Sequence, residues 1–388
     1  MSPDAPARAA RRAVTVIFLL NGLLFGAWAT RIPAVKDGLD LSEGRLGVAL
    51  ALIAVGALSA MPVSGWMSAR HGSRWTTRLT AVAFCLATPL PAFAPTYPTL
   101  LLACFVLGAS GGALDVAMNA HGVAVEQRHP APILSSFHAA FSAGGLIGAA
   151  SGSLAAGLGI DARVHLATMA VLGLAAVPAA GRALLPGDVD HAEDDAPLLV
   201  RPPRRLWALG LIGLCGLLAE GASGDWSAVY VRDSLGAGAG VAGLAFAAFS
   251  LTMTAGRLVG DRLTTAWGAD RLVRRGGMLG AAGLGAALLI GEPWAAITGF
   301  ACLGAGLSAV VPTIFRAAGN TPGIAPGVAL AAVSTAGYTG FLAGPPCIGF
   351  LAQATSLPVA LALLVVLGLV IAVLAPRVSA PVREPVSA

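Results

Sequence analysis

The chain has 388 residues, of which 56% are hydrophobic and only 11% are charged, and its mean hydropathy is +0.80. These values lie far outside the range of soluble globular proteins and predict an integral membrane protein. The net charge of +5 does not indicate a nucleic-acid partner, because the basic residues form short clusters between apolar runs instead of a stripe with aromatic residues. The five cysteines lie singly in apolar segments without CxxC spacing, which favours buried small residues over a disulfide or a metal site.

Twelve apolar segments follow one another along the chain, each of roughly the 18 to 25 residues that a helix needs to cross a ~30 Å hydrocarbon core. We expect them at 13–33, 45–68, 76–94, 99–123, 133–158, 164–184, 206–230, 239–259, 276–291, 294–315, 328–353 and 357–375. Because the apolar runs are continuous and do not alternate, they predict helices and not the strands of a barrel. The first segment could instead be a secretory signal cleaved near Ala27 and Ala29, but it is long for one and contains Asn21 and Trp28.

Lys and Arg residues are divided unequally between the two sides of these segments. The side of the N-terminus holds 19 of the 24, and the other side holds 5, Arg31, Lys36, Arg45, Arg163 and Arg232. By the positive-inside rule, this division places both termini in the cytoplasm, and it supports an even number of helices.

One long hydrophilic insert, LPGDVDHAEDDAPLLVRPPRR at 185–205, divides the chain into two sets of six helices. Its proline and charge content predicts a cytoplasmic linker between an N-terminal bundle at 1–184 and a C-terminal bundle at 206–388. The halves echo one another, since LGASGGALDV (107–116) is similar to LGAGLSAVVP (303–312). Two pseudo-symmetric six-helix bundles are typical of major facilitator transporters, whose substrate site lies near the midplane.

The resemblance to the major facilitator superfamily extends over nearly the whole chain. The segments GWMSARHGSR (65–74) and GRLVGDRLTTAWGADR (256–271) resemble the superfamily's loop signature, G-x-x-x-D-R-x-G-R-R. The resemblance implies close helix contact at the glycine and binding of helix ends and a carboxylate by the arginines. The matching residues are Gly65, Arg70, Gly72 and Arg74 in the first copy, and Asp261 and Arg262, with one extra residue of spacing, in the second. Ala69 stands where the signature has Asp, so we expect the charged clamp to depend more on the second half.

Within the superfamily, LDVAMN (114–119) resembles the L/I-E-x-A-x-N pattern of the fucose:proton symporter group. That resemblance implies proton coupling by Asp115 and places Asn119 at the pattern's asparagine. WATRIP (28–33), SSFHAAFSAGG (135–145), which contains Ser142, and EGASGDWSAVY (220–230) are similar to a bacterial subgroup whose substrates are mostly unassigned. The carboxylate associated with sugar symport in the first helix of that group is absent here, where Trp28, Ala29 and Thr30 stand.

Asp115 is also a candidate on physical grounds alone. An ionised Asp at the bilayer centre costs at least ~2.5 kcal/mol, so such residues face a bundle interior or an aqueous cavity. Asn119 lies four residues later, on the same helix face, and we expect His138 at a similar depth on the next helix. The three residues therefore predict either a proton relay or a static hydrogen-bonded contact between helices. His121 lies on another face near the cytoplasmic end, which favours snorkelling or a helix-end contact over a role in transport.

The seventh segment carries a second group of polar residues, Glu220, Asp225, Trp226 and Tyr230. Glu220 is expected near the midplane, facing the substrate cavity or making a static interhelical bond. In the major facilitator architecture that the chain resembles, the first and seventh helices approach at the periplasmic gate. Arg31 is then a candidate partner for Asp225 or Glu220, in an ion pair that closes this side, although a rim contact would be worth only ~0 to 1 kcal/mol.

The eleventh segment contains GFLAGPPCIG (340–349), which resembles a string that drug:proton antiporters carry in their fifth helix. Here it sits in a different helix, so we interpret it as a packing and bending element. Tyr338, Trp28 and Phe141 are candidates to stack on a solute, with bundle core or an interfacial anchor as the alternative for each.

The sequence thus predicts an inner-membrane secondary transporter that moves a small polar organic solute, with sugars favoured, by proton-coupled symport. The alternative in the same class is a proton-coupled exporter of drugs or metabolites. A membrane enzyme is disfavoured by the lack of a nucleotide loop, HExxH, GxSxG or a dense His/Asp cluster, and a sensor by the lack of a long soluble segment. We expect a monomer in the bilayer, with protons and a small solute as partners and with no cofactor.

Overall fold

The computed structural model describes residues 5–41, 43–186, 204–237 and 239–379, and these residues form helices and no strand. The first half contains α1 (Ala5–Gly38), α2 (Glu43–His71), α3 (Ser73–Ala87), α4 (Leu90–Phe93), α5 (Tyr97–Glu126), α6 (Leu134–Gly157) and α7 (Ala162–Ala183). The second half contains α8 (Arg204–Val229), α9 (Ala239–Trp267), α10 (Ala269–Ile290), α11 (Pro293–Leu307), α12 (Val310–Gly319), α13 (Pro326–Ala354) and α14 (Leu357–Leu374). A π-helical turn, Tyr230–Ser234, extends α8.

The helices occupy all twelve predicted positions, with α3 and α4 sharing the third and α11 and α12 sharing the tenth. Within the described residues, ten of the twelve segments are long and apolar enough by themselves to cross a membrane. The third, interrupted after the 15 residues of α3, and α9 lie outside that set. The fold is the predicted all-α membrane fold of twelve transmembrane helices in two pseudo-symmetric sets of six.

Several helices run past the ends of their apolar cores. The first helix begins at Ala5 instead of residue 13, and α9 continues to Trp267 instead of ending near residue 259. The added turns carry charged side chains that hydropathy assigns to loops, although backbone hydrogen bonding continues through them. The interruptions within the third and tenth segments lie beside Pro89 and Pro312, which have no backbone N–H to continue a helix.

Backbone contacts divide the chain into two compact units, which differ slightly from the predicted bundles. Unit 1 comprises Met1–Arg201 together with Ala325–Thr335, which includes the start of α13, and unit 2 comprises Pro202–Ile324 and Ala336–Ala388. The predicted linker at 185–205 falls largely outside the described residues, so the bundle boundaries stay a prediction.

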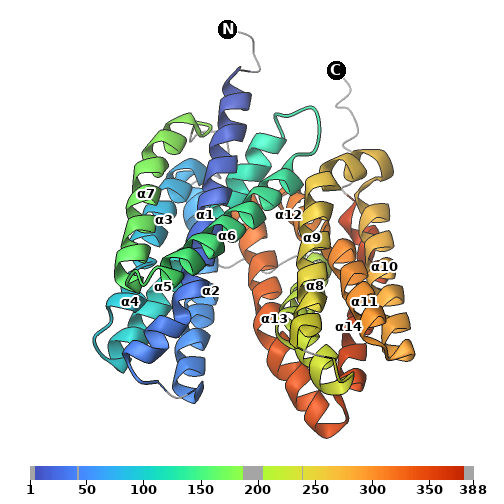
Figure 1. Ribbon diagram of the computed structural model, residues 1–388. Helices are drawn as coiled ribbons and strands as arrows, with labels where there is room; N and C mark the ends of the chain where they lie inside the picture. The colour runs from blue at the N-terminus through green and yellow to red at the C-terminus, as the bar shows by residue number, and fades with distance from the viewer. Residues whose placement is uncertain (1–4, 42, 187–203, 238, 380–388) are drawn as a thin grey trace, which may run out of the picture. The chain divides into compact units, whose positions relative to one another are not determined.

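Glycines allow α1 and α6 to pack backbone to backbone in unit 1, where Figure 1 shows the two helices side by side. A Cβ at Gly26 of α1 would overlap the carbonyl oxygen of Gly145 in α6. In return, a Cβ at Gly148 would lie 2.8 Å from the backbone nitrogen of Ala27. Close approach of small residues is how membrane helices associate where water supplies no driving force.

The same type of contact recurs at corresponding positions in each half of the chain. The pairs are Ile53 with Gly108 between α2 and α5, Leu214 with Gly340 between α8 and α13, and Phe249 with Gly304 between α9 and α11. The first helix of each half therefore packs on the fifth, and the second on the fourth, which is the structural form of the sequence repeat. The contact of Gly340 with α8 agrees with a packing role for GFLAGPPCIG.

Single glycines also form the turns at matching places in the halves. Gly72 joins α2 to α3 with φ 81°, and Gly268 joins α9 to α10 with φ 83°. Only glycine adopts this left-handed region without strain.

Candidate functional site

Asp115 lies in α5 of unit 1, inside the part of the chain that spans the membrane. Asn119, one turn later, is fully buried, and its amide donates to the Asp115 backbone carbonyl at 2.8 Å and to Asp115 Oδ1 at 3.3 Å. The other carboxylate oxygen, Oδ2, is buried without a hydrogen-bond partner among the described residues, and so is Asn119 Oδ1. The four-residue spacing thus produces the predicted shared face, and it leaves two buried acceptor oxygens unsatisfied.

His138 lies near the start of α6 and is 7% exposed. Its ring packs edge-on against Phe18 of α1, with 5.3 Å between the ring centroids. One turn later, the Ser142 hydroxyl donates to the His138 backbone carbonyl at 3.1 Å. Trp28, also on α1, is buried at 4% exposure. The predicted partnership of His138 with Asp115 and the stacking of Trp28 on a solute stay predictions.

Glu220 of α8 has a partner that the sequence analysis missed. Arg257 of α9 lies 3.5 Å from the Glu220 carboxylate, and their side chains are 10% and 26% exposed, respectively. The segment expected at 239–259 would put Arg257 near the end of its helix, whereas α9 continues ten residues beyond Arg257. An ion pair inside a membrane helix bundle is costly unless both partners are held, so the pair marks a second polar centre in unit 2.

Asp225 of α8 is exposed, and Tyr338 of α13 is partly buried. In unit 1, Arg31 is 3% exposed and donates to the backbone carbonyls of Gly152 in α6 and of Ile160 between α6 and α7. The predicted gate would join Arg31 to Asp225 or Glu220 in the other unit and stays a prediction. Within its own unit, Glu220 already has the Arg257 guanidinium as a partner.

The first copy of the loop signature makes contacts with backbone and rings. A Cβ at Gly65 would lie 2.6 Å from the carbonyl oxygen of Gly327, which belongs to the same unit. Arg70 lies over the Trp66 ring at 5.5 Å, and Arg74 donates to the Arg182 carbonyl at 3.2 Å.

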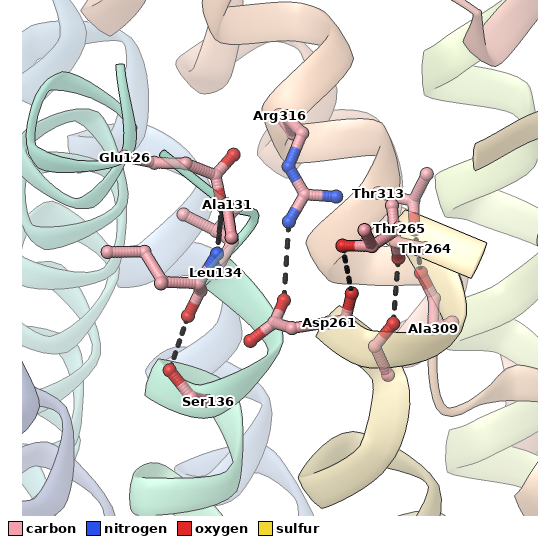
Figure 2. A network of polar contacts seen from close by, with 12 residues as sticks. Glu126, Ala131, Leu134, Ser136, Asp261, Thr264, Thr265, Ala309, Thr313 and Arg316 are labelled. Carbon is pink, nitrogen blue, oxygen red and sulfur yellow. Dashed lines mark hydrogen bonds and ion pairs between the residues drawn. The ribbon is translucent and has the colours of Figure 1, made fainter. Parts of the chain in front are cut away.

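The second copy contains a charged contact. Figure 2 shows the Arg316 guanidinium of α12 directed at the Asp261 carboxylate of α9, 3.4 Å away, with both side chains about 15% exposed. Arg262, the next residue, is exposed. The sequence does not indicate Arg316 as the partner of Asp261, because the two residues lie 55 positions apart along the chain.

No group of three or more His, Cys, Asp or Glu that could hold a metal ion occurs in the part of the chain that the structure describes.

Comparison with known proteins identifies the family. The model of the Major Facilitator Superfamily matches residues 14–222. An uncharacterised MFS-type transporter of Yersinia pestis is 37% identical over 92% of this chain and 92% of its own length. Membrane protein MosC of Rhizobium meliloti is 34% identical over 93% of this chain and 88% of its own.

Solved structures share the fold at low sequence identity. The Escherichia coli fucose:proton symporter FucP matches with a TM-score of 0.77 at 16% identity, covering 96% of this chain and 98% of its own. The human organic anion transporter MFSD10 matches with a TM-score of 0.75 at 18% identity, covering 95% and 99%. The family model matches more than half of this chain, and the relatives and solved structures match it nearly from end to end. This multi-pass membrane protein with a twelve-helix fold therefore belongs to the Major Facilitator Superfamily of transporters.

Proposed function

We propose that the protein is a proton-coupled secondary transporter of the bacterial cytoplasmic membrane that moves a small polar organic solute, most simply a sugar, by alternating access. Both termini lie in the cytoplasm in this proposal, as the distribution of Lys and Arg predicts. The transporter acts as a monomer.

The observation that carries the proposal is the incompletely satisfied carboxylate of Asp115. Its Oδ2 is buried without a partner among the described residues, whereas native proteins rarely leave a buried polar atom unpaired. An ionised carboxylate within a membrane span is expensive, and protonation removes that cost. Asp115 would therefore take up a proton before the loaded carrier reorients and release it on the other side.

The neighbouring asparagine supports a hydroxylated solute. Asn119 Oδ1, one turn from Asp115, is likewise buried without a hydrogen-bond partner in the described part of the chain. Two adjacent acceptors suit the O–H groups of a sugar, since each O–H needs an acceptor once water is excluded. A fucose:proton symporter and a proton:xylose symporter are among the proteins that share the fold, so such a solute is compatible with it.

Three further groups complete the mechanism that we propose. His138 relays the proton to or from Asp115, while Ser142, Glu220, Trp28 and Tyr338 line the solute path. Arg31 closes the periplasmic side through Asp225, since Glu220 has Arg257 as its partner within unit 2.

The test is proton movement evoked by solute in liposomes that contain a pH dye. Wild-type protein and Asp115→Asn are given sugars, sugar acids, amino acids and cationic drugs in turn. Acidification of the lumen on adding one solute outside, in wild type and not in Asp115→Asn, is the expected result. If a solute that is loaded inside the liposomes causes protons to move inward, the protein is the proton-coupled exporter instead. If solute moves equally in both proteins without any pH change, proton coupling through Asp115 is wrong.

A further inference from the structure

A pocket of about 380 Å³ opens in unit 1 where α1 ends, α7 begins and α4 lies between them. Most of its lining is small or apolar and includes Ala34 and Val35 of α1, Leu39 directly after α1, Ala92 of α4 and Ile160 before α7. Three charged residues also line it, Arg31, Asp161 and Arg163. The pocket lies within unit 1 and is lined by neither Asp115 nor Glu220. Of its lining residues, the transport mechanism above uses Arg31 alone.

The buried cation in the pocket wall is Arg31, which is 3% exposed. Its two terminal nitrogens donate to the backbone carbonyls of Gly152 and Ile160, and its Nε is buried without a partner among the described residues. Neutral carbonyls satisfy donors but do not neutralise a guanidinium, and burying a charge without an opposite charge costs several kcal/mol. An anion in the pocket would supply the missing charge.

The start of α7 adds to the positive potential of the pocket. This helix has 22 residues, and its first turn, with Ala162 and Arg163, lines the cavity. Helix N-termini attract anions because their N–H groups are unpaired and the helix dipole is positive there. The Arg163 Nε donates to the Ala92 carbonyl at 3.1 Å, which holds this second guanidinium at the pocket wall.

Among the described residues that line the pocket, Asp161 is the one carboxylate, and it already has a structural role. It caps α7 by accepting the Arg163 backbone N–H at 2.7 Å. Two arginines and one aspartate leave the lining with an excess of positive charge, to which the helix end adds.

We infer that this pocket, built from Arg31, Arg163 and the start of α7, binds an anionic group of the size of a phosphate or a carboxylate. The planar forks of two arginines are the side chains best suited to such oxyanions. A soluble anion and the headgroup of an anionic phospholipid share this chemistry. The site uses the same guanidinium as the proposed gate, but it needs Arg163 and not Asp225, so the two proposals fail independently.

The experiment measures binding to the whole protein, purified into nanodiscs of zwitterionic phosphatidylcholine at constant ionic strength. In one arm, inorganic phosphate and acetate are titrated and their binding is measured by calorimetry. In the other arm, phosphatidylglycerol is added to the disc lipid and the thermal unfolding of the protein is measured. The variants are Arg163→Gln, Asp161→Asn, which keeps an N-cap acceptor, and Arg31→Lys, which keeps the charge without the fork. Arg45→Gln is the matched control, because Arg45 is exposed, lies over the Tyr97 ring at 5.3 Å and does not line the pocket.

We expect one site, with Arg163→Gln weakening the binding about threefold to fivefold and Asp161→Asn strengthening it by a similar factor. Arg31→Lys should weaken it about tenfold, and Arg45→Gln should match wild type. Saturation by phosphate or acetate identifies a soluble anion, and stabilisation by phosphatidylglycerol alone identifies a lipid headgroup. Absence of saturable binding in both arms, unchanged affinity in Arg163→Gln and Asp161→Asn, or an equal loss in Arg45→Gln would overturn the inference.

Discussion

Both ring nitrogens of His121, a buried residue of α5, have hydrogen-bond partners. Nε2 accepts the Leu185 backbone N–H at 3.1 Å, so the ring proton lies on Nδ1, which is 2.7 Å from the Ser73 hydroxyl. The imidazole thereby joins three segments, α5, the start of α3 and the chain that follows α7. This is the helix-end contact that the sequence favoured, and it gives the residue a structural role.

Removing this imidazole should destabilise unit 1. In His121→Ala, the Leu185 N–H and the Ser73 hydroxyl lose a buried partner, which we expect to cost roughly 2–4 kcal/mol. Thermal unfolding in detergent, followed by tryptophan fluorescence, measures the shift. His71→Ala removes an exposed imidazole beside Trp66 and Trp75 and should cost less than about 1 kcal/mol. Equal midpoints for the two variants would contradict the structural role of His121.

At single residues, the sequence predicted contacts along one helix and missed contacts between helices. Asp115 and Asn119 meet because a spacing of four residues fixes them on one face. Arg257 and Arg316 were missed as partners of Glu220 and Asp261, because helix packing brings together residues 37 and 55 positions apart. The spacing of residues along one helix shows which side chains share a face, but not which neighbouring helix that face contacts.

At the scale of elements, α1 and α6 offer a matched pair of glycines. A Cβ at Gly148 would lie 2.8 Å from the Ala27 nitrogen, whereas one at Gly145 would meet nothing closer than the Gly22 oxygen at 3.8 Å. We expect Gly148→Ala to cost about 1–3 kcal/mol by forcing the helices apart. Gly145→Ala should be neutral or slightly stabilising, because alanine has the higher helix propensity.

Thermal unfolding and gel filtration of the two alanine variants test this interface. The expected order of stability is Gly145→Ala at or above wild type and Gly148→Ala below it, with aggregation appearing first in Gly148→Ala. The reverse order would show that α1 and α6 do not pack through these glycines.

The start of α6 depends on a carboxylate from the end of the preceding helix. Glu126 Oε2 accepts the backbone N–H groups of Ile133 and Leu134 at 2.7 and 2.8 Å, as Figure 2 shows for Leu134. A negative charge is favourable at a helix N-terminus, and the bonds satisfy two donors that the helix leaves free.

Glu126→Ala should therefore fray α6 and cost about 1–2 kcal/mol. Glu126→Gln keeps an acceptor oxygen without the charge, so its loss should be smaller. Hydrogen–deuterium exchange of the segment that begins at Leu134 measures the effect locally. Unchanged exchange in Glu126→Ala would show that the cap does not hold the helix.

Hydropathy predicted these elements well and their ends poorly. All twelve segments were placed because each buries a continuous apolar core, which hydropathy detects. The extra turns of α1 and α9 and the interruptions near Pro89 and Pro312 were not predicted. Hydropathy reports which part of a helix lies in the bilayer and not how far its backbone hydrogen bonds continue. A helix predicted from hydropathy therefore ends where the charged residues begin.

At the scale of the whole molecule, the internal repeat is the feature that the sequence predicted best. Weak likeness between the halves predicted two sets of six helices, and each half shows the same helix pairs and the same glycine turns. The proton relay and the gate combine residues from several helices, and the gate combines both units. Their spacing along the chain does not constrain them, so they remain proposals.

The central claim is that Asp115 couples solute to protons, and one paired measurement tests it most directly. Liposomes that contain wild type or Asp115→Asn are assayed with the solute that the pH-dye experiment selects. Solute exchange is measured first without a gradient, and uphill uptake is then measured after the external medium is made alkaline or acid. We predict that Asp115→Asn still exchanges solute, because the neutral amide resembles the protonated acid. The variant should no longer accumulate solute when the external medium is made acid. Wild-type accumulation should rise as the external pH falls. Uphill uptake that persists in Asp115→Asn with the same dependence on the pH gradient would contradict the account.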